Sequence, residues 1–385
     1  MSSPKRVLII ENSIHVTGAL KSIIRVAFDL RHLYSFVFVL PSGSQGRFLV
    51  EKFGFTAIYE LPMKELNRRV KSFLVYLPYL IDNSLKLRKL IRKESIDLIH
   101  VNDLYNLIPV VYKVLGGSKP YICHIRFLPT GFPKSIFNLW LNLHVKFSER
   151  IIVVSLFLKN QLPSHDKIEW IPNELPMEEQ YPSADFRTPK DVYTFLYLAN
   201  YIPGKGQNYA LESFARINES LPNWRLRFAG GDMGLRKNKM FRDQLKASAR
   251  EMGIDKKIDW IEFVEDTEHE YKSADIILNF SESESFSITC LEALFYGMPL
   301  IATDCGGPAE IVDHNLTGLL VLNRDIDSMA KAMIQLANDR DLRIQFEESS
   351  RSISRKRFSL EKTSYRLYDV YNKVLESDHV IIGKE

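Results

Sequence analysis

Short apolar runs alternate along the first half of the chain with longer stretches of helical spacing. The apolar runs predict buried strands at 6–11, 34–41, 96–103, 119–126 and 149–155. Residues 18–30, between the first two runs, have the spacing of an amphipathic helix. Strands that are apolar on both faces and separated by helices are typical of parallel sheets covered on both sides. This half is therefore predicted to be an α/β domain.

The same alternation restarts after a proline-rich connection. Residues 170–191 hold four of the seventeen prolines and no apolar period, as is typical of a connection between domains. Beyond it, apolar runs predict strands at 192–200, 224–231, 257–263, 274–280, 299–304 and 318–321. Helical spacing recurs at 207–220, 239–252, 287–297 and 325–338. The repeated pattern predicts two Rossmann-like, doubly wound domains that face one another.

One more helical segment follows near the end of the chain. Aromatic and aliphatic residues keep a helical period from Tyr365 to Val374. This segment is long enough to cross from the second domain back to the first. We therefore predict an N-terminal domain at 1–180, a C-terminal domain at 181–355, and a returning helix with a tail at 356–385.

Composition is that of a globular protein. The 385 residues are 45% hydrophobic and 25% charged, and their number suits two domains. Cys123, Cys290 and Cys305 are widely spaced, which argues against a disulfide framework and against a zinc site. The first apolar run is too short for a signal peptide, and no run approaches the length of a membrane span. We expect a cytoplasmic protein without a metal centre.

Positive charge is concentrated in the first half. Residues 1–180 carry 24 Lys and Arg against 15 Asp and Glu, whereas the whole chain has a net charge of +4. Residues 64–93 are basic and rich in aromatic and aliphatic side chains, so Arg68, Arg69 and Lys71 are candidates for contact with an anionic membrane surface. A solvated helix face explains the same pattern. Nucleic-acid binding has no motif to support it.

Glycines and a lysine follow the strands of the second half. In a parallel α/β sheet, ligands bind beyond the carboxyl ends of the strands. Lys205 lies between two glycines at a predicted helix start, where it could neutralise a phosphate, although a tight turn with an exposed lysine gives the same pattern. Gly230 follows the next strand and is a weaker signal.

Two glutamates accompany the predicted helix 287–297. Its N-terminus offers free amides and partial positive charge, which suit a diphosphate. Glu284 precedes the helix and Glu292 lies inside it, so both can face one cleft. Carboxylates repel phosphate, and sugar hydroxyls are therefore their natural partners. Glu282 has no such placement, and we expect it to be solvated.

Around these residues the sequence resembles the retaining glycosyltransferases of the GT-B fold, specifically family 4 (glycosyl transferases group 1). Glu284 and Glu292 have the spacing of the family's E-x7-E motif. The run from Ala274 to Val321 is similar to the family's sequence from the strand before that motif to its Thr-Gly-Leu-Leu-Val. The segments PGKG, WIPNELP and RFSLEKTSYRLYDVY are similar to further family motifs. The resemblance covers 170–375 and is looser in the N-terminal half.

The resemblance implies roles for individual residues. Glu292 would bind the ribose hydroxyls of a nucleotide, Glu284 the hydroxyls of the donor sugar, and Lys205 the diphosphate, in place of a metal ion. The amides of Phe286, Ser287 and Ile288 would hold the sugar and the diphosphate. Further donor contacts are placed at Asn200, Gly230 and Ser285.

In the N-terminal half, two residues acquire roles from the resemblance. Gly18 lies in a loop similar to the family's glycine loop beside the phosphates. His124 resembles a histidine close to the donor sugar and is counted as catalytic with Glu284 and Lys205, although a core histidine is the alternative. Four polar residues at strand ends are expected to be structural: His15, His100, Asn102 and Asp103.

The chain departs from the family pattern at two places. Ala199 and Asn200 stand where the family has Gly-Arg, so a second cation is missing, and Arg126 is a candidate substitute. Ser285 and Ser287 replace glycines, which would narrow the pocket or change its sugar preference. No Asp or Glu base is evident, in agreement with the front-face mechanism proposed for the family, in which the leaving phosphate oxygen deprotonates the acceptor.

The resemblance implies a retaining, metal-independent transferase that moves a sugar from a nucleotide-diphosphate donor, a UDP-sugar in preference to a GDP-sugar. The acceptor is expected to be a saccharide or lipid-linked saccharide of bacterial capsule, O-antigen (lipopolysaccharide) or exopolysaccharide synthesis. The protein would then be cytoplasmic and peripheral on the inner face of the cytoplasmic membrane. Two alternatives stay open. One is a catalytically silent partner subunit of the same fold, and the other is a sugar-nucleotide 2-epimerase.

Overall fold

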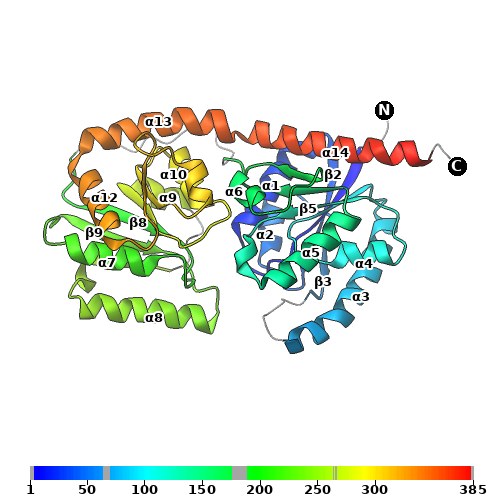
Figure 1. The fold of residues 1–385 in the computed structure, drawn as a ribbon, viewed down its shortest axis with the longest axis horizontal. Coiled ribbons are helices and arrows are strands. Elements are labelled where there is room, and N and C mark those ends of the chain that lie inside the picture. Colours follow the sequence, from blue (N-terminus) through cyan, green and yellow to red (C-terminus); the bar gives the residue numbers. More distant parts are fainter. Residues whose placement is uncertain (1–3, 64–69, 176–188, 263, 265–266, 383–385) are drawn as a thin grey trace. The chain divides into compact units, whose positions relative to one another are not determined.

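The computed structural model describes residues 4–63, 70–175, 189–262, 264 and 267–382, without the side chains of 70–75 and 377–382. These residues form two compact units, the first from 1–174 and 360–385 and the second from 175–359. The predicted boundaries at 180 and 355 lie beside these divisions. The predicted class, two parallel-sheet Rossmann-like α/β domains, is confirmed (Figure 1).

The first unit contains a parallel sheet with the strand order β3-β2-β1-β4-β5-β6-β7. Its strands are β1 (Lys5–Ile10), β2 (Tyr34–Pro41), β3 (Ile58–Leu61), β4 (Leu98–Val101), β5 (Tyr121–Ile125), β6 (Arg150–Val153) and β7 (Ile168–Trp170). The sequence pattern did not predict β3 and β7, because both are short and only partly buried and so lack a continuous apolar run.

Helices cover the sheet of the first unit. They are α1 (Gly18–Asp29), α2 (Gly46–Lys52), α3 (Val70–Lys93), α4 (Ile108–Val114), α5 (Lys134–Phe147), α6 (Leu156–Asn160) and α14 (Leu360–Ile382). Although α14 is last in the chain, it packs on α1 and β2 (Figure 1). Leu367, Val370 and Tyr371 repeat with helical spacing and bury one face of α14 in that core.

The second unit repeats this plan with the strand order β10-β9-β8-β11-β12-β13. Its strands are β8 (Tyr193–Leu198), β9 (Trp224–Ala229), β10 (Ile258–Ile261), β11 (Ile276–Asn279), β12 (Leu300–Thr303) and β13 (Leu319–Val321). Its helices are α7 (Gln207–Ile217), α8 (Arg236–Glu251), α9 (Thr267–Ser273), α10 (Ile288–Phe295), α11 (Gly307–Ile311), α12 (Ile326–Asn338) and α13 (Arg340–Phe358). In the described residues, no helix combines the length and the apolar character needed to cross a bilayer.

Candidate functional site

Strand order predicts a ligand-binding crevice at the carboxyl edge of the second sheet. The chain runs outward from β8 through β9 and β10 on one side, and then continues with β11 on the other side of β8. The segments that follow the neighbouring strands β8 and β11 therefore leave in opposite directions. Such a place is a topological switch point, and ligands of open α/β sheets bind there. The segments after β8 and β11 carry Lys205 and Glu284, so both predicted residues come to this switch point.

The loop that carries Lys205 is tied to the end of β11 through Tyr197. The hydroxyl of this buried tyrosine accepts from the Phe280 amide at 2.7 Å and donates to the Lys205 carbonyl. Gly206 then caps α7 with φ of +82°, and a Cβ there would lie 1.9 Å from the Phe280 carbonyl oxygen. The loop is thus pressed against the β11 end, in a conformation that requires glycine.

This close packing gives a test of the loop. We expect Gly206→Ala to lower the free energy of unfolding by about 3 kcal/mol, from the left-handed backbone and the clash together. Gly204→Ala is the matched control, since Gly204 has φ of +92° but open space around its Cβ position. It should lose only about 1–2 kcal/mol. Equal losses in urea unfolding of the two variants would show that the contact with Phe280 is unimportant.

Lys205 and Glu284 form an ion pair at the mouth of the crevice. The Lys205 Nζ lies 3.0 Å from Glu284 Oε1, and the Ser281 hydroxyl donates to the same oxygen at 2.7 Å. Burial alone would lower the pKa of Lys205, but the charge and hydrogen bond of Glu284 outweigh it and the pKa is raised. Lys205 is therefore cationic at neutral pH. Its side chain is 34% exposed and can still reach a ligand.

Helix α10 begins directly behind this pair. Ser287 is its N-cap, and the Ser287 hydroxyl accepts from the Cys290 amide at 3.4 Å and from the Asn279 side chain at 2.9 Å. The side chain is 3% exposed. Ser287 therefore stabilises the helix start, where the first amides lack acceptors within the helix. The effect of Ser287 on the width of the pocket and on its sugar preference stays a prediction.

Ser285, Phe286 and Ile288 belong to the turn that leads into α10. Ile288 is the first residue of α10, and Ser285 is half-buried just before it. Phe286 is buried and packs edge-on against Phe358 at 6.0 Å between ring centroids. Amides along this turn and the α10 N-terminus give the site partial positive charge beside Lys205.

Glu292 lies deeper than Glu284, within α10. It is 5% exposed, and the Tyr271 hydroxyl of α9 lies 3.4 Å from its Oε2. Burial and the charge of Glu292 raise the pKa of Tyr271 well above its usual value, so this hydroxyl keeps its proton and can donate. In the part of the chain that the structure describes, no group of three or more His, Cys, Asp or Glu side chains could hold a metal ion.

Glu282 is partly exposed, with 28% of its side chain accessible, and it also makes contacts that the sequence did not predict. Its carboxylate accepts from the Tyr209 hydroxyl at 2.8 Å and pairs with the Arg324 guanidinium. These partners outweigh the effect of burial and lower the pKa of Glu282. Glu282 therefore anchors its loop to α7 and to the segment after β13 while part of its side chain stays in contact with solvent.

Asn200 and Gly230 support the crevice through the backbone. The Asn200 side chain accepts from the Gly231 amide at 3.1 Å, and the Asn200 carbonyl accepts from Gln207. Gly230 packs so tightly that a Cβ would lie 2.1 Å from the Ala199 carbonyl oxygen. Both positions therefore shape the loops after β8 and β9, and Asn200 supplies no cation in place of the family's arginine.

The predicted residues of the N-terminal half lie in the first unit. Gly18 is the first residue of α1, directly after the N-cap Thr17. The preceding loop is fixed by buried Glu11, whose Oε1 accepts from the amides of Asn12 and Ser13 at 2.9 and 3.0 Å. This loop follows β1 at the carboxyl edge of the first sheet, where the predicted glycine loop belongs.

His124 and His100 stack at the ends of β5 and β4, with ring centroids 5.5 Å apart. Burial, the charge of Arg126 and the neighbouring His100 lower the pKa of His124 well below its usual value. The imidazole is therefore neutral at pH 7. Both of its ring nitrogens are buried, and among the described residues they have no hydrogen-bond partner. His100 differs, since its Nδ1 lies 2.7 Å from the Tyr371 hydroxyl.

Arg126 is engaged within the first unit. Its guanidinium donates to Asn102 at 2.9 Å and to Asn173 at 2.6 Å. Burial lowers the pKa of Arg126 to about 10 against the opposing charges of Glu174 and Glu11, so it stays cationic at neutral pH. Its contacts tie β4 and β5 to the segment after β7, which is a structural role. The substitution of Arg126 for the missing arginine stays a prediction.

The remaining predicted residues have contacts of the fold or lie outside its description. His15 contacts Gln45 at 3.1 Å, and the Asp103 side chain accepts from the Leu104 amide at 2.9 Å. Burial raises the pKa of Asp103 well above its usual value. Arg68 and Arg69 lie outside the described residues, and so does the side chain of Lys71 in the first turn of α3.

Three residues of the site were missed by sequence reasoning. Ser281, Tyr197 and Tyr271 hold Glu284, the Lys205 loop and Glu292 respectively. Ser281 directly follows the end of a predicted strand, so its place could have been noticed. The two tyrosines carry no such signal, because each is buried in its unit and meets its partner only through tertiary packing.

Family models match most of the chain in two parts. The model described as Glycosyltransferase Family 4 matches residues 25–177, and the model described as Glycosyl transferases group 1 matches residues 182–353. A glycosyltransferase of Haemophilus influenzae is 26% identical over 162 residues, 42% of this chain and 44% of that protein. The D-inositol 3-phosphate glycosyltransferase of Corynebacterium jeikeium is 32% identical over 179 residues, 46% and 42% of the two chains. The matches thus span less than half the length of these relatives.

Solved structures share the fold over nearly the whole chain. Anabaena Alr3699/HepE in complex with UDP-glucose has a TM-score of 0.80 at 16% identity, and covers 96% of this chain and 99% of its own. Sucrose-phosphate synthase from Thermosynechococcus elongatus has a TM-score of 0.78 at 17% identity, with coverages of 97% and 100%. At such identities the likeness concerns the fold alone.

Proposed function

The chain belongs to the family 4 glycosyltransferases of the GT-B fold, and on that premise we propose that it transfers a sugar from a UDP-sugar to an acceptor hydroxyl with retention of configuration. The observation that carries the proposal is the Lys205–Glu284 pair, held at 3.0 Å at the switch point beside the N-terminus of α10. One group suits a diphosphate, the other suits sugar hydroxyls, and the helix amides suit both.

Donor binding in this proposal uses the second unit. The diphosphate lies against Lys205 and the first amides of α10, because these supply the positive charge of the crevice. Glu284 accepts from hydroxyls of the sugar, and Glu292 accepts from the ribose deeper in the unit. The choice of UDP is supported by the structural likeness to a protein that was solved with UDP-glucose.

The chemistry consists of one substitution at the sugar. The bond between the anomeric carbon and the β-phosphate oxygen breaks, and a bond from that carbon to the acceptor oxygen forms on the same face. The acceptor proton passes to the leaving phosphate oxygen, so the protein need not supply a base. Lys205 and the α10 amides stabilise the charge that develops on the diphosphate, in place of a metal ion. Neutral His124 offers a hydrogen bond, not a positive charge, to its ligand.

The acceptor in this proposal is a saccharide or a lipid-linked saccharide of a bacterial cell-surface polysaccharide. Support comes from the family and from a relative named as an exopolysaccharide phosphotransferase in Streptomyces coelicolor, 29% identical over 182 residues. A panel of nucleotide sugars incubated without acceptor tests the donor directly, since slow hydrolysis identifies it. Binding of neither UDP nor GDP would favour a silent partner subunit, and isomerisation of a UDP-sugar would favour a 2-epimerase.

The placement of the ribose at Glu292 gives a second prediction. We expect Glu292→Gln to weaken UDP binding by about tenfold, because a charge-assisted hydrogen bond is replaced by a neutral one. Calorimetry with UDP and with 2′,3′-dideoxy-UDP measures it. Wild type should bind the dideoxy ligand at least about tenfold more weakly than UDP, and the variant should show a smaller difference in affinity between the two ligands.

Glu282→Gln is the matched control for this experiment. It removes the same charge from the same segment, but Glu282 contacts Tyr209 and Arg324 instead of the crevice. We expect its UDP affinity to stay within about twofold of wild type. If Glu292→Gln keeps full preference for UDP over the dideoxy ligand, Glu292 does not hold the ribose, whatever its effect on affinity.

A further inference from the structure

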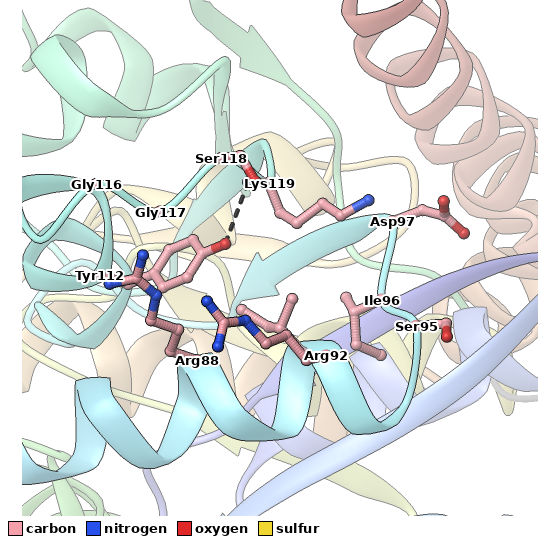
Figure 2. A pocket seen from close by; sticks show the side chains of 11 residues that line it. Arg88, Arg92, Ser95, Ile96, Asp97, Tyr112, Gly116, Gly117, Ser118 and Lys119 are labelled. Atoms are coloured by element: carbon pink, nitrogen blue, oxygen red, sulfur yellow. Dashed lines mark hydrogen bonds between the residues drawn. The ribbon is translucent and has the colours of Figure 1, made fainter.

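A pocket of about 360 Å³ lies in the first unit, away from the residues discussed so far. Its walls come from the last turns of α3, the turn that leads into β4, and the loop that leads from α4 into β5 (Figure 2). Every lining residue belongs to the first unit, between Arg88 and Lys119. The pocket is therefore complete within one unit.

The pocket lies at the amino edge of the sheet. Asp97 immediately precedes β4, and Lys119 lies two residues before β5. The two strands are parallel neighbours, so their amino ends share one edge. Glu11 and His124 belong to the carboxyl edge, where ligands of such sheets normally bind. The pocket is thus separate from the predicted glycosyl-transfer residues.

Three cations line the pocket: Arg88, Arg92 and Lys119. Arg88 donates to the Leu115 carbonyl at 3.0 Å. In the described part of the chain, no carboxylate lies within ion-pair distance of any of the three. Three cations and one carboxylate, Asp97, leave the lining with a net positive charge.

Asp97, the acidic residue of the lining, already has partners. Its carboxylate accepts from the Arg6 amide at 2.9 Å and pairs with Lys5 at 3.4 Å. In Figure 2 the guanidinium groups of Arg88 and Arg92 lie toward the Tyr112 end of the view, and the Asp97 carboxylate lies toward the other end. Asp97 therefore does not neutralise the two arginines.

The wall formed by α4 and the loop after it is closely packed. Tyr112 is 3% exposed, and its hydroxyl accepts from the Lys119 amide at 3.2 Å, the bond dashed in Figure 2. Gly117 packs on this ring so closely that a Cβ would lie 2.4 Å from it. The loop that carries Lys119 is thus fixed against α4, and in Figure 2 the Lys119 ammonium lies toward the Asp97 end of the pocket.

We propose that this pocket binds a phosphate monoester. The two guanidinium forks at the Tyr112 end match the charge and the several acceptor oxygens of a phosphate, because arginine binds phosphate through paired hydrogen bonds, and Lys119 adds positive charge to the same lining. A neutral sugar would leave the three cations without counter-charge. The proposal does not depend on the function proposed above, because none of these residues belongs to the crevice after β8 and β11.

The surface beside the pocket indicates where the phosphate comes from. Leu77, Ile81 and Leu85 are 58%, 45% and 45% exposed and follow one another at intervals of four on α3, in line with its basic end. Val114 and Leu115, at the end of α4, are 63% and 40% exposed. An exposed apolar row beside a basic pocket suits a phosphate that is carried on a lipid. A soluble phosphate monoester has the same charged group, so the experiment tests a lipid and a soluble ligand separately.

The test uses the full chain and two double variants of equal charge change. Arg92→Glu with Lys119→Glu reverses two cations of the pocket, and Lys52→Glu with Lys159→Glu reverses two exposed cations of the first unit outside its lining and outside α3. The lipid arm measures co-sedimentation with phosphatidylcholine vesicles with and without phosphatidic acid. The soluble arm measures calorimetric binding of glycerol 3-phosphate, with Lys205→Met included so that binding at the crevice is recognised.

We expect the pocket variant to bind phosphatidic acid vesicles about tenfold or more weakly than wild type, and the control variant to stay within about threefold. Binding of glycerol 3-phosphate without vesicle binding, lost in the pocket variant and kept in Lys205→Met, would assign the site to a soluble phosphate. The proposal is overturned if neither probe binds, or if both double variants lose the same factor. Thermal unfolding of each variant confirms that it is folded.

Discussion

Lys205→Met should lower kcat/KM for sugar transfer by about a hundredfold to a thousandfold, while the protein stays folded. Lys205 is the cation at the switch point of the second sheet, where we propose that the diphosphate leaves. A preorganised positive group at developing charge contributes this much in other enzymes. The raised pKa of Lys205 keeps it charged up to alkaline pH, so the loss should be the same from pH 6 to pH 9. Steady-state kinetics on the donor found by the hydrolysis panel measures it.

A double-substitution cycle separates catalysis from positioning. If Lys205 only holds Glu284 in place, then Lys205→Met should have no further effect in a Glu284→Gln background. If it stabilises the leaving diphosphate, the loss should persist there. Arg324→Met is the matched control, because Arg324 pairs with Glu282 on the same segment but lies outside the crevice. A loss of less than about threefold in Lys205→Met would contradict the proposed role.

The fold could be predicted because its signals are local. Strands such as 34–41 are continuous apolar runs, and the structure has β2 at Tyr34–Pro41. Helix α14 shows its buried face as a helical period. By contrast, β3 and β7 are short and partly buried, and their strand character comes from pairing with β2 and β6. Such pairing is decided by distant segments and leaves little trace in the local pattern.

In the candidate site, too, some residues could be predicted from local sequence and others could not. Lys205 and Glu284 were found because they follow strand ends, and strand order alone brings them to one switch point. The partners that fix them depend on tertiary packing. Tyr197 reaches the Lys205 carbonyl from within the sheet, and Glu282 meets Arg324 across 42 positions of sequence. The two serines of the motif illustrate the limit, since only the structure shows that Ser287 caps α10.

Acidification should unfold the first unit far more readily than the second. Burial lowers the pKa of His100 to about 3 and of His144 to about 4, and it lowers the pKa of His124 well below its usual value. These histidines stay neutral in the fold at pH 5, whereas the unfolded chain protonates them below about pH 6.5. Unfolding therefore takes up protons, and stability falls as the pH drops below that value. Asp103 has the opposite sign, because its raised pKa keeps a proton in the fold that the unfolded chain releases.

Each of the three histidines corresponds to about 2 kcal/mol of unfolding free energy lost by the first unit between pH 7 and pH 5, and Asp103 and Glu174, whose pKa values are raised by burial, offset part of this loss. The four tryptophans allow each unit to be followed separately: Trp140 and Trp170 lie in the first unit, and Trp224 and Trp260 lie in the second. Urea unfolding of variants that keep one pair, with phenylalanine in the other, gives both transitions. His100→Gln should reduce the acid loss of the first unit by about 2 kcal/mol, because one protonating group is removed from the unfolded chain. Equal acid shifts of the two transitions would mean that these histidines are not buried and neutral in the folded protein.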